Sequence, residues 1–379
     1  MAGFPIGSCD FLLTGPGKSV IVGQVVFPVR TNVHGSNKKR RETMKKMLSL
    51  LLALGMVLTL AACGASGAPA GTEAAPTAGA DPAAQGKVYK VGICQLVQHE
   101  ALDAATQGFM DKLTELLGEG NVEFDLQNAS GDTATCGTIV NAFVSDNVDL
   151  IMANATAALQ AAAAATADIP ILGTSITEYG VAMDIKDFDG IVGGNVSGTS
   201  DLAPLDVQAQ MVKEWFPEAK NVGLLYCSAE ANSQYQVDTV QKYLEDLGYT
   251  CKQYSFTDSN DMLAVTQAAA DESDVMYIPT DNTLASGTGI IDPICQAAGV
   301  PVIAGEEGIC DGCGVATLSI SYYDLGVKTA EMAYDVLTGA ADISTMPVGY
   351  ADKQTPKYNK RICEALNLTP LEGYVPIGE

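Results

Sequence analysis

The chain of 379 residues contains few histidine, tryptophan and basic residues. It has two histidines and one tryptophan, and its 21 Lys and Arg are outnumbered by 45 Asp and Glu. His99 is the single histidine after residue 62 and no nucleophile motif accompanies it, so the sequence predicts neither a Ser-His-Asp set nor a histidine-based metal site. A formal net charge of −24 disfavours nucleic acid as a partner. We therefore expect a protein without catalytic residues, metal or cofactor.

Long apolar runs are scarce as well. After Cys63 no 18 apolar residues follow one another, so no later membrane-spanning helix is expected. One short run exists, where Met44-Lys45-Lys46 opens a stretch of Leu, Ala, Met and Val over residues 44–62. A charged start, a short apolar segment and small residues at its end are typical of an export signal peptide. The ending Leu60-Ala61-Ala62-Cys63 resembles the lipobox of bacterial lipoproteins, which implies that Cys63 becomes the lipid-carrying first residue.

The segments on either side of this signal differ in character. Residues 1–43 contain the basic cluster Lys38-Lys39-Arg40-Arg41, and we interpret them as a mis-assigned upstream extension of a chain that starts at Met44. Residues 63–86 are rich in Ala, Gly, Pro and Thr without apolar periodicity, which is typical of a flexible tether. From residue 63 onward the chain carries 13 basic and 43 acidic side chains, a formal charge of −30, so lipid rather than a basic surface would hold it at a membrane.

The remaining cysteines are dispersed among apolar positions, which is typical of buried thiols that behave as small hydrophobic residues. One pair lies close together in the sequence, in Cys310-Asp311-Gly312-Cys313. A metal site would need further ligands nearby, so a chance pair or a local disulfide is the favoured interpretation, and the sequence leaves these two open. Apart from Cys9 and Cys63, the cysteines are Cys94, Cys136, Cys227, Cys251, Cys295, Cys310, Cys313 and Cys363.

From residue 87 onward short apolar runs alternate with segments of helical spacing, which is typical of βαβ units and parallel sheets with helices on both faces. The first series predicts strands at 87–94, 122–126, 149–152 and 169–173 and helices at 101–117, 132–144 and 156–165. The second predicts helices at 205–216, 233–247, 261–270 and 290–298 and strands at 221–226, 250–255, 274–278 and 300–303. Two similar series predict an α/β protein of two lobes with a ligand cleft between them.

Small polar and acidic residues follow the expected carboxyl end of nearly every strand, and such ends converge on one crevice in a doubly wound sheet. Hydroxyls and free backbone N–H groups there suit a carboxylate, whereas Asp281, Glu306 and Glu307 suit an ammonium group. The pattern favours a zwitterionic ligand. A role as helix caps or turn residues stays open for Asn154, Thr156, Ser175 and Asp281. The adjacent acids Glu306 and Glu307 have no obvious capping role, although a solvated surface pair stays open.

Several ordered motifs carry a family resemblance. They are residues 98–104, 195–201, 228–233, 279–283, 304–308 and 322–326. Together they resemble the tryptophan/tyrosine-type ABC transporter substrate-binding proteins, which have the type I periplasmic-binding fold. The resemblance extends from Val88 to about Leu337. It implies a monomeric, lipid-anchored receptor outside the bacterial cell membrane, which captures a small solute and delivers it to an ABC permease with its ATPase. The solute it implies is an amino acid, and an aromatic one.

The resemblance also implies three crossings between the lobes, near residues 199–201, 317–319 and 340–342. Lobe I would then comprise residues 87–200 plus 319–341, and lobe II residues 201–318 plus 342–379. One departure concerns the turn after Ala155-Thr156, which relatives commonly continue with Pro-Ser where this chain has Ala157-Ala158. The exchange removes a possible hydroxyl contact with the ligand.

On this basis we predict that Thr156, Ser175 and Thr177 hold the ligand carboxylate, and that Asp281, with Glu306 or Glu307, holds the ammonium group. The remaining predicted contacts of the ligand are Tyr322, which would flank its side chain, and Gln95, His99, Ser197, Ser228, Glu230, Asn232 and Asn282.

Three other functions were weighed. A hydrolase with Glu306 and Glu307 as its carboxyl pair is disfavoured, because neighbours on one loop seldom stand about 5–10 Å apart across a bond. A sensory-system component with the same fold stays an alternative, as does a receptor for a sugar or nucleoside. A sugar is less favoured because the single tryptophan, Trp215, lies in a predicted helix where core packing accounts for it.

Overall fold

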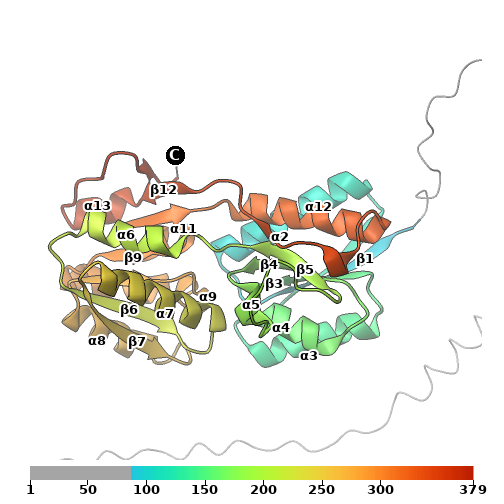
Figure 1. Cartoon of the computed structure of the whole chain (residues 1–379), viewed down its shortest axis with the longest axis horizontal. Coiled ribbons are helices and arrows are strands. Elements are labelled where there is room, and N and C mark those ends of the chain that lie inside the picture. Colours follow the sequence, from blue (N-terminus) through green and yellow to red (C-terminus); the bar gives the residue numbers. More distant parts are fainter. Residues whose placement is uncertain (1–86, 379) are drawn as a thin grey trace, which may run out of the picture. The chain divides into compact units, whose positions relative to one another are not determined.

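The computed structural model describes residues 87–378, which form two parallel sheets with helices on both faces (Figure 1). The α/β class with two doubly wound lobes is therefore confirmed. The predicted signal segment, Cys63 and the tether lie outside the described residues. Within residues 87–378, no helix is both long enough and apolar enough to cross a bilayer.

The first sheet has the strand order β11-β5-β4-β3-β1-β2, and all its pairings are parallel. Its central strand β3 is buried at every position, as expected for a strand covered on both faces. The strands are β1 (Tyr89–Gln95), β2 (Val122–Asn128), β3 (Leu150–Asn154), β4 (Ile171–Ile176), β5 (Val196–Ser200) and β11 (Gly349–Tyr350). The helices are α2 (Glu100–Leu117), α3 (Thr133–Ser145), α4 (Thr156–Ala165), α5 (Tyr179–Ala182) and α12 (Tyr322–Thr338), with a 3₁₀ turn η2 (Ile343–Thr345).

The second sheet has the order β13-β12-β10-β9-β8-β6-β7, with one antiparallel pairing, β10 with β12. Its strands are β6 (Asn221–Cys227), β7 (Thr250–Phe256), β8 (Val275–Ile278), β9 (Val302–Ala304), β10 (Ala316–Ser319), β12 (Thr355–Tyr358) and β13 (Val375–Pro376). Its helices are α6 (Leu205–Trp215), α7 (Ala231–Asp246), α8 (Met262–Glu272), α9 (Asn282–Ala285), α10 (Thr288–Ala298), α11 (Glu307–Cys313) and α13 (Lys360–Ala365).

Each sheet separates two layers of core. In the first lobe, Phe143 of α3 and Leu159 of α4 pack on one face, while Phe109 and Leu113 of α2 pack on the other beside α12. In the second lobe, α6, α7 and α13 cover one face and α8, α10 and α11 the other (Figure 1). In both sheets the strand order reverses once, between β1 and β3 and between β6 and β8. Ligands of doubly wound sheets bind beyond the carboxyl ends of the strands at such reversals.

The third crossing differs from the prediction. Gly349 and Tyr350 pair in parallel with Thr199 and Ser200 of β5, so β11 forms the edge of the first sheet. The side chain of Ser197 also donates a hydrogen bond to the carbonyl of Met346. The expectation that the chain enters lobe II at residue 342 is therefore wrong, because η2 and β11 belong to the first lobe and the chain crosses between β11 and β12.

Candidate functional site

A small cavity lies where the carboxyl ends of the strands of both sheets meet. It brings together residues from both lobes, and eight of them were predicted to contact a ligand. These eight are His99, Ser175, Thr177, Asn232, Asp281, Asn282, Glu306 and Tyr322, and the other lining residues are Leu102, Asp201, Thr280 and Ala285.

A second cavity adjoins this one and shares Glu306 and Tyr322 with it. It is lined mainly by the crossing segments and the first turn of α12, and its lysines Lys328 and Lys357 are paired with Asp352 and Glu307. We place the functional site in the first cavity, because that one gathers the loops after the strand ends of both sheets.

The hydroxyl groups of the first lobe come from an irregular end of β4. The register of β4 against β5 shifts between Gly173 and Ile176, and Ser175 has a left-handed backbone with φ 56°. Such a conformation costs energy for a residue other than glycine and is maintained only when its surroundings enforce it. The Ser175 hydroxyl is buried and has no hydrogen-bond partner. An orphaned polar atom of this kind marks a place for a missing partner.

Close packing between β4 and β5 supports this irregular end. A Cβ atom on Gly198 would lie 2.0 Å from the carbonyl oxygen of Gly173, so only glycine allows this approach. The hydroxyl of Tyr179 lies within hydrogen-bond distance of the carbonyls of Gly173 and Thr199, at 3.1 and 3.2 Å. The strand end that carries Ser175 is thus fixed from two sides.

Asp201 follows β5 directly and is almost fully buried. The hydroxyl of Tyr322 donates to its Oδ2 at 3.0 Å, whereas Oδ1 is buried without a partner. Burial raises the pKa of Asp201 to about 6, although the hydroxyls of Tyr322 and Thr177 act in the opposite direction. This carboxyl therefore combines a free oxygen with a strongly reduced tendency to ionise.

Glu306 of the second lobe also lines the cavity and is nearly fully buried. Its carboxylate caps α11, accepting from the backbone N–H of Ile309 at 2.5 Å and of Gly308 at 2.7 Å. The prediction that this residue has no capping role is therefore wrong. Burial raises the pKa of Glu306 to about 7 against these two hydrogen bonds, and the neighbouring Glu100 and Asp201 raise it further.

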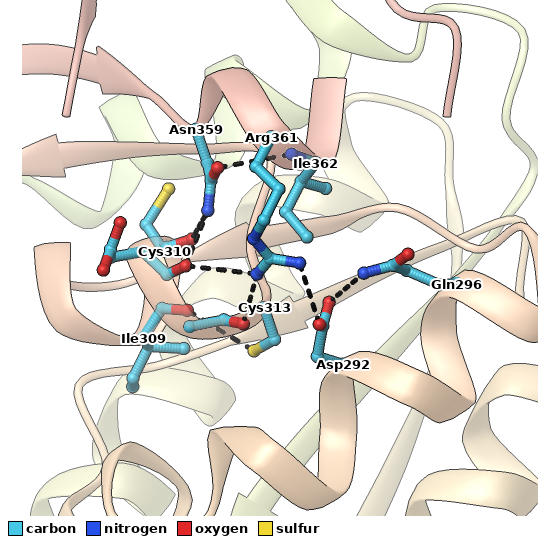
Figure 2. Close-up of polar contacts among 10 residues, drawn as sticks. Asp292, Gln296, Ile309, Cys310, Cys313, Asn359, Arg361 and Ile362 are labelled. Atoms are coloured by element: carbon cyan, nitrogen blue, oxygen red, sulfur yellow. Dashed lines mark hydrogen bonds and ion pairs between the residues drawn. The ribbon is translucent and has the colours of Figure 1, made fainter. Parts of the chain in front are cut away.

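The other end of α11 is held by the C-terminal part of the chain, as Figure 2 shows. The Asn359 side chain donates to the carbonyls of Cys310 and Asp311, at 2.9 and 2.7 Å. Arg361 donates to the carbonyl of Gly312 at 3.0 Å and pairs with Asp292 of α10 at 2.9 Å. These donors satisfy carbonyls that the helix end leaves free, so α11 is fixed at both ends and Glu306 is held in place.

The two cysteines of α11 are buried in the core of the second lobe as free thiols. Burial raises the pKa of both Cys310 and Cys313 well above the ordinary thiol value. Within residues 87–378, no three His, Cys, Asp or Glu side chains converge in a way that would hold a metal ion.

A second capped loop contributes Asp281 and Asn282. The carboxylate of Asp281 accepts from the backbone N–H of Leu284 at 2.8 Å and of Cys227 at 2.7 Å. Glu230 lies behind this loop and accepts hydrogen bonds from the backbone and side chains of Asn282 and Thr283 at 2.7 to 3.0 Å, and a longer one from the Asn232 side chain at 3.4 Å. Burial and the nearby Glu230 raise the pKa of Asp281. Both oxygens of each carboxyl are thus already bonded within the second lobe.

His99 connects the lobes across the mouth of the cavity. Its Nε2 lies 3.2 Å from Oδ1 of Asn282, although His99 precedes α2 in the first lobe and Asn282 begins α9 in the second. Burial lowers the pKa of His99, while the bond to Asn282 and the charge of Glu230 oppose this effect. The contact depends on the lobes being close together.

The other predicted residues do not line the cavity. Gln95 is bonded within the first lobe, to Asp103 at 2.6 Å and Thr106 at 2.7 Å, and Thr156 is buried at the start of α4. Glu307 turns away to Lys357, at 2.8 Å, and to the hydroxyl of Ser319. The remaining three predicted residues are hydrogen-bonded elsewhere in the protein. Ser197 bonds to Met346, Ser228 bonds to the carbonyl of Phe256, and Glu230 holds the α9 loop.

The lining residues define what the cavity can bind. It has the carboxyl groups of Asp201, Asp281 and Glu306, several hydroxyls and amides, and apolar surface from Leu102 and Ala285. None of the residues that line it within the described part of the chain is a lysine or arginine. Such a site suits a cationic group together with a second group that hydroxyls, amides and His99 can bind.

The chain was compared with protein families and with known proteins. The family model described as ABC transporter substrate binding protein matches residues 90–373. A protein of Clostridioides difficile (strain R20291) named "Tyrosine-binding protein" is 34% identical over 331 residues, which cover 86% of this chain and 94% of that one.

Several solved structures are also similar to this chain. An ABC domain from Streptococcus pneumonia, in complex with L-Trp, has a TM-score of 0.73 and 31% identity and covers 76% of this chain and 100% of that one. The ligand-free, open structure of a substrate binding protein with adhesive properties from Clostridium difficile has a TM-score of 0.60 and 37% identity, covering 76% and 99%. A leucine binding protein from Thermotoga maritima, at 14% identity and a TM-score of 0.51 over 68% and 84%, shares the fold alone.

Proposed function

The chain belongs to the ABC transporter substrate binding protein family, and from this premise we propose that it captures an amino acid in the cleft between its lobes. It then delivers this amino acid to an ABC permease driven by an ATPase. An aromatic amino acid is the leading ligand, since one relative is named for tyrosine and another was solved with L-Trp.

The observation that carries the proposal is a pair of buried polar atoms without partners in one cavity, Asp201 Oδ1 and Ser175 Oγ. A carboxylate and a hydroxyl in the lining of one cavity match the ammonium and carboxylate groups of an amino acid. We assign the ammonium group to Asp201, whose Oδ1 has no partner in the protein, together with Glu306, which lines the same cavity from the other lobe.

The carboxylate is assigned to the hydroxyls of Ser175 and Thr177, both of which line the cavity. Thr156 is left out because it does not line the cavity. The side chain of the ligand would extend along Leu102, Ala285 and the ring of Tyr322. These apolar groups add the hydrophobic contact that an aromatic ring needs.

Capture follows from differential binding to two states of the lobes. Ser175 and Asp201 come from the first lobe and Glu306 from the second, so one ligand can contact all three only when the lobes are close. The ligand therefore shifts the population toward the closed state, which the contact between His99 and Asn282 also stabilises.

We further propose that the protein works outside the cell, lipid-anchored through Cys63. The Leu60-Ala61-Ala62-Cys63 sequence supports this anchor, and the Ala- and Gly-rich segment that follows supplies a tether. Mass spectrometry of the purified protein would detect a diacylglyceryl group on Cys63. Recovery of unmodified Cys63 in a chain that retains residues 1–62 would refute the anchor.

Isothermal titration calorimetry tests the ligand. The full chain, purified in detergent, should bind L-tyrosine or L-tryptophan far more tightly than a sugar or a nucleoside. If no amino acid produced heat or raised the melting temperature, while a sugar or nucleoside did, the amino-acid assignment would fall.

A further inference from the structure

Two carboxyl groups from opposite lobes line the cleft without a basic partner. Asp201 follows β5 of the first sheet, and Glu306 follows β9 of the second. Both are nearly fully buried, and the charge of Asp201 acts on Glu306. Burial disfavours the ionised form of each carboxyl, and the like charge of Asp201 adds to this effect at Glu306, so the state in which both groups are ionised is disfavoured.

The charged and titratable groups around the pair do not relieve this repulsion. Asp201 faces Tyr322, Tyr179 and Glu306. Glu306 faces Glu100 of α2, Tyr322 of α12 and the thiols of Cys310 and Cys313. Lys357, which contacts the acid adjacent to Glu306, is already paired with that acid, Glu307. Further carboxyls stand at the other side of the cavity, Asp281 with Glu230 behind it, next to His99.

The hydrogen bonds leave room for one positive charge. Tyr322 satisfies Oδ2 of Asp201, but Oδ1 is buried without a partner. The oxygens of Glu306 each accept one N–H bond, and a carboxylate has about four lone-pair sites. An unpaired buried carboxylate oxygen is costly, and either a proton or an ammonium group removes this cost.

We propose that Asp201 and Glu306 act together as the specificity determinant of the cleft, in which one of the two carboxyls holds a proton when the lobes close without ligand and exchanges it for the ligand's ammonium group. The proton leaves to solvent as the ammonium charge enters, so the charge at the carboxyl pair stays the same, while the ligand carboxylate is held at Ser175 and Thr177. This inference rests on the proposed function and adds to it: a ligand must carry a free ammonium group, and its capture releases a proton.

Burial of the two carboxyls also determines the direction in which ligand affinity depends on pH. Because burial raises the pKa of Asp201 to about 6 and of Glu306 to about 7, the protonated forms persist toward neutral pH. The ligand binds the deprotonated pair, so its affinity is highest above pH 7 and falls as the pH decreases through these values. One exchanged proton changes the dissociation constant by about tenfold for each pH unit below them.

The same proton exchange predicts different affinities for different chemical classes of ligand. An N-acetylated amino acid or a carboxylic acid without the amine brings no cation, so it cannot replace the proton and should bind at least about 100-fold more weakly. An aromatic amine without a carboxylate retains the exchange and loses only the contacts to Ser175 and Thr177. A charge-bearing contact is worth about 1.5–3 kcal/mol, which corresponds to about 10- to 100-fold in affinity.

Calorimetry in two buffers measures the proton directly. The full chain in detergent is titrated at pH 7 with L-tyrosine or L-tryptophan, once in phosphate and once in Tris, which differ in their heat of ionisation. We expect the observed heat to differ between buffers by an amount that reports the release of about half a proton at pH 7, and of more at pH 6. Asp201→Asn and Glu306→Gln should each remove the buffer dependence and weaken binding by more than about tenfold.

Glu307→Gln is the matched control, since Glu307 is the adjacent acid but pairs with Lys357 and does not line the cleft. It should keep both affinity and proton release. Tyr322→Phe offers a second route should the Asp201 variant fold poorly. It removes a donor that stabilises the ionised form of Asp201, so the pH at which affinity falls should move upward.

The outcomes separate the inference from the function on which it rests. Tight binding of an amino acid with identical heats in both buffers, at pH 6 and 7, would overturn the proton exchange and leave the receptor function intact. Equal binding of the N-acetylated ligand would do the same. If no amino acid bound the wild-type chain, the proposed function and this inference would both be overturned.

Discussion

The two lobes build their halves of the cleft in opposite ways. The first lobe offers atoms without protein partners, Ser175 Oγ and Asp201 Oδ1. The second offers the carboxyls of Asp281 and Glu306, whose oxygens already accept backbone hydrogen bonds, with Glu230 supporting the Asp281 loop from behind the cavity. We infer that the first lobe supplies the most open contacts to a ligand, whereas the second supplies a rigid charged surface. Substitutions in the first lobe should therefore change ligand affinity alone, whereas substitutions in the second lobe should change protein stability as well.

The strongest test of this contrast is Glu230→Ala. The change leaves four donors of Asn282 and Thr283 without their acceptor at a buried position, so we expect a loss of about 3–5 kcal/mol in the free energy of unfolding. Urea denaturation monitored by circular dichroism measures it. Affinity should fall too, because the loop that carries Asp281 and Asn282 loses its support. A loss below about 1 kcal/mol would show that the loop does not depend on this carboxylate.

Ser175→Ala tests the opposite behaviour in the first lobe. The hydroxyl has no partner in the protein, so the free energy of unfolding should change by less than about 0.5 kcal/mol. Ligand affinity should fall about 10- to 100-fold, because a hydrogen bond to the ligand carboxylate is lost. Ser228→Ala is the matched control, since its hydroxyl bonds to the carbonyl of Phe256 outside the cavity, and it should leave affinity unchanged.

His99→Ala probes the contact that joins the lobes. Loss of one neutral hydrogen bond to Asn282 should weaken ligand binding by about 1 kcal/mol, or about fivefold, without changing the selectivity among ligands. Burial in the closed state lowers the pKa of His99, so closure favours the neutral ring and is opposed as the pH falls below the ordinary histidine value. The affinity of the wild type relative to the variant should therefore decrease between pH 8 and pH 5.5. A constant ratio over this range would contradict the assignment.

The smallest expected effect belongs to Arg361→Ala. The guanidinium group is about half exposed and bonds to Gly312 and Asp292, so its loss should cost about 1 kcal/mol of stability and leave affinity nearly unchanged. Lys252→Ala is the matched control, because it removes an exposed ion pair with Glu272 that is not bonded to α11, and it should leave the stability nearly unchanged. Equal effects of the two changes would indicate that α11 needs no support at its C-terminal end.

Much of the fold follows from the sequence, because long elements have strong periodicity. The alanine-rich helix at 156–165 was located to the residue, and Asp132 caps α3 as predicted, accepting from Ala134. The resemblance to the substrate-binding family is confirmed by the family match and the curated relative. The two-residue strand β11 has no comparable signal, since its place depends only on pairing with β5. That is why the third crossing was misplaced.

The site was predicted less completely, and the reasons are physical. Helix α11 has seven residues and includes Gly308 and Gly312, so its sequence resembles a loop, and the capping role of Glu306 was missed. Asp201 was assigned to a crossing between lobes. Its proposed role depends on burial beside Tyr322, a residue 121 positions away in the chain. The available sequence signal was an acidic residue directly after a predicted strand end. Thr280 was recognised only as part of a loop motif.

Among the described residues, no lysine or arginine lines the first cavity, so the cavity should discriminate between ligands by their net charge. Aspartate and glutamate would bring an extra anionic group to carboxyls that already repel one another, and this mismatch rejects them whatever their size. Neutral zwitterions meet no such obstacle.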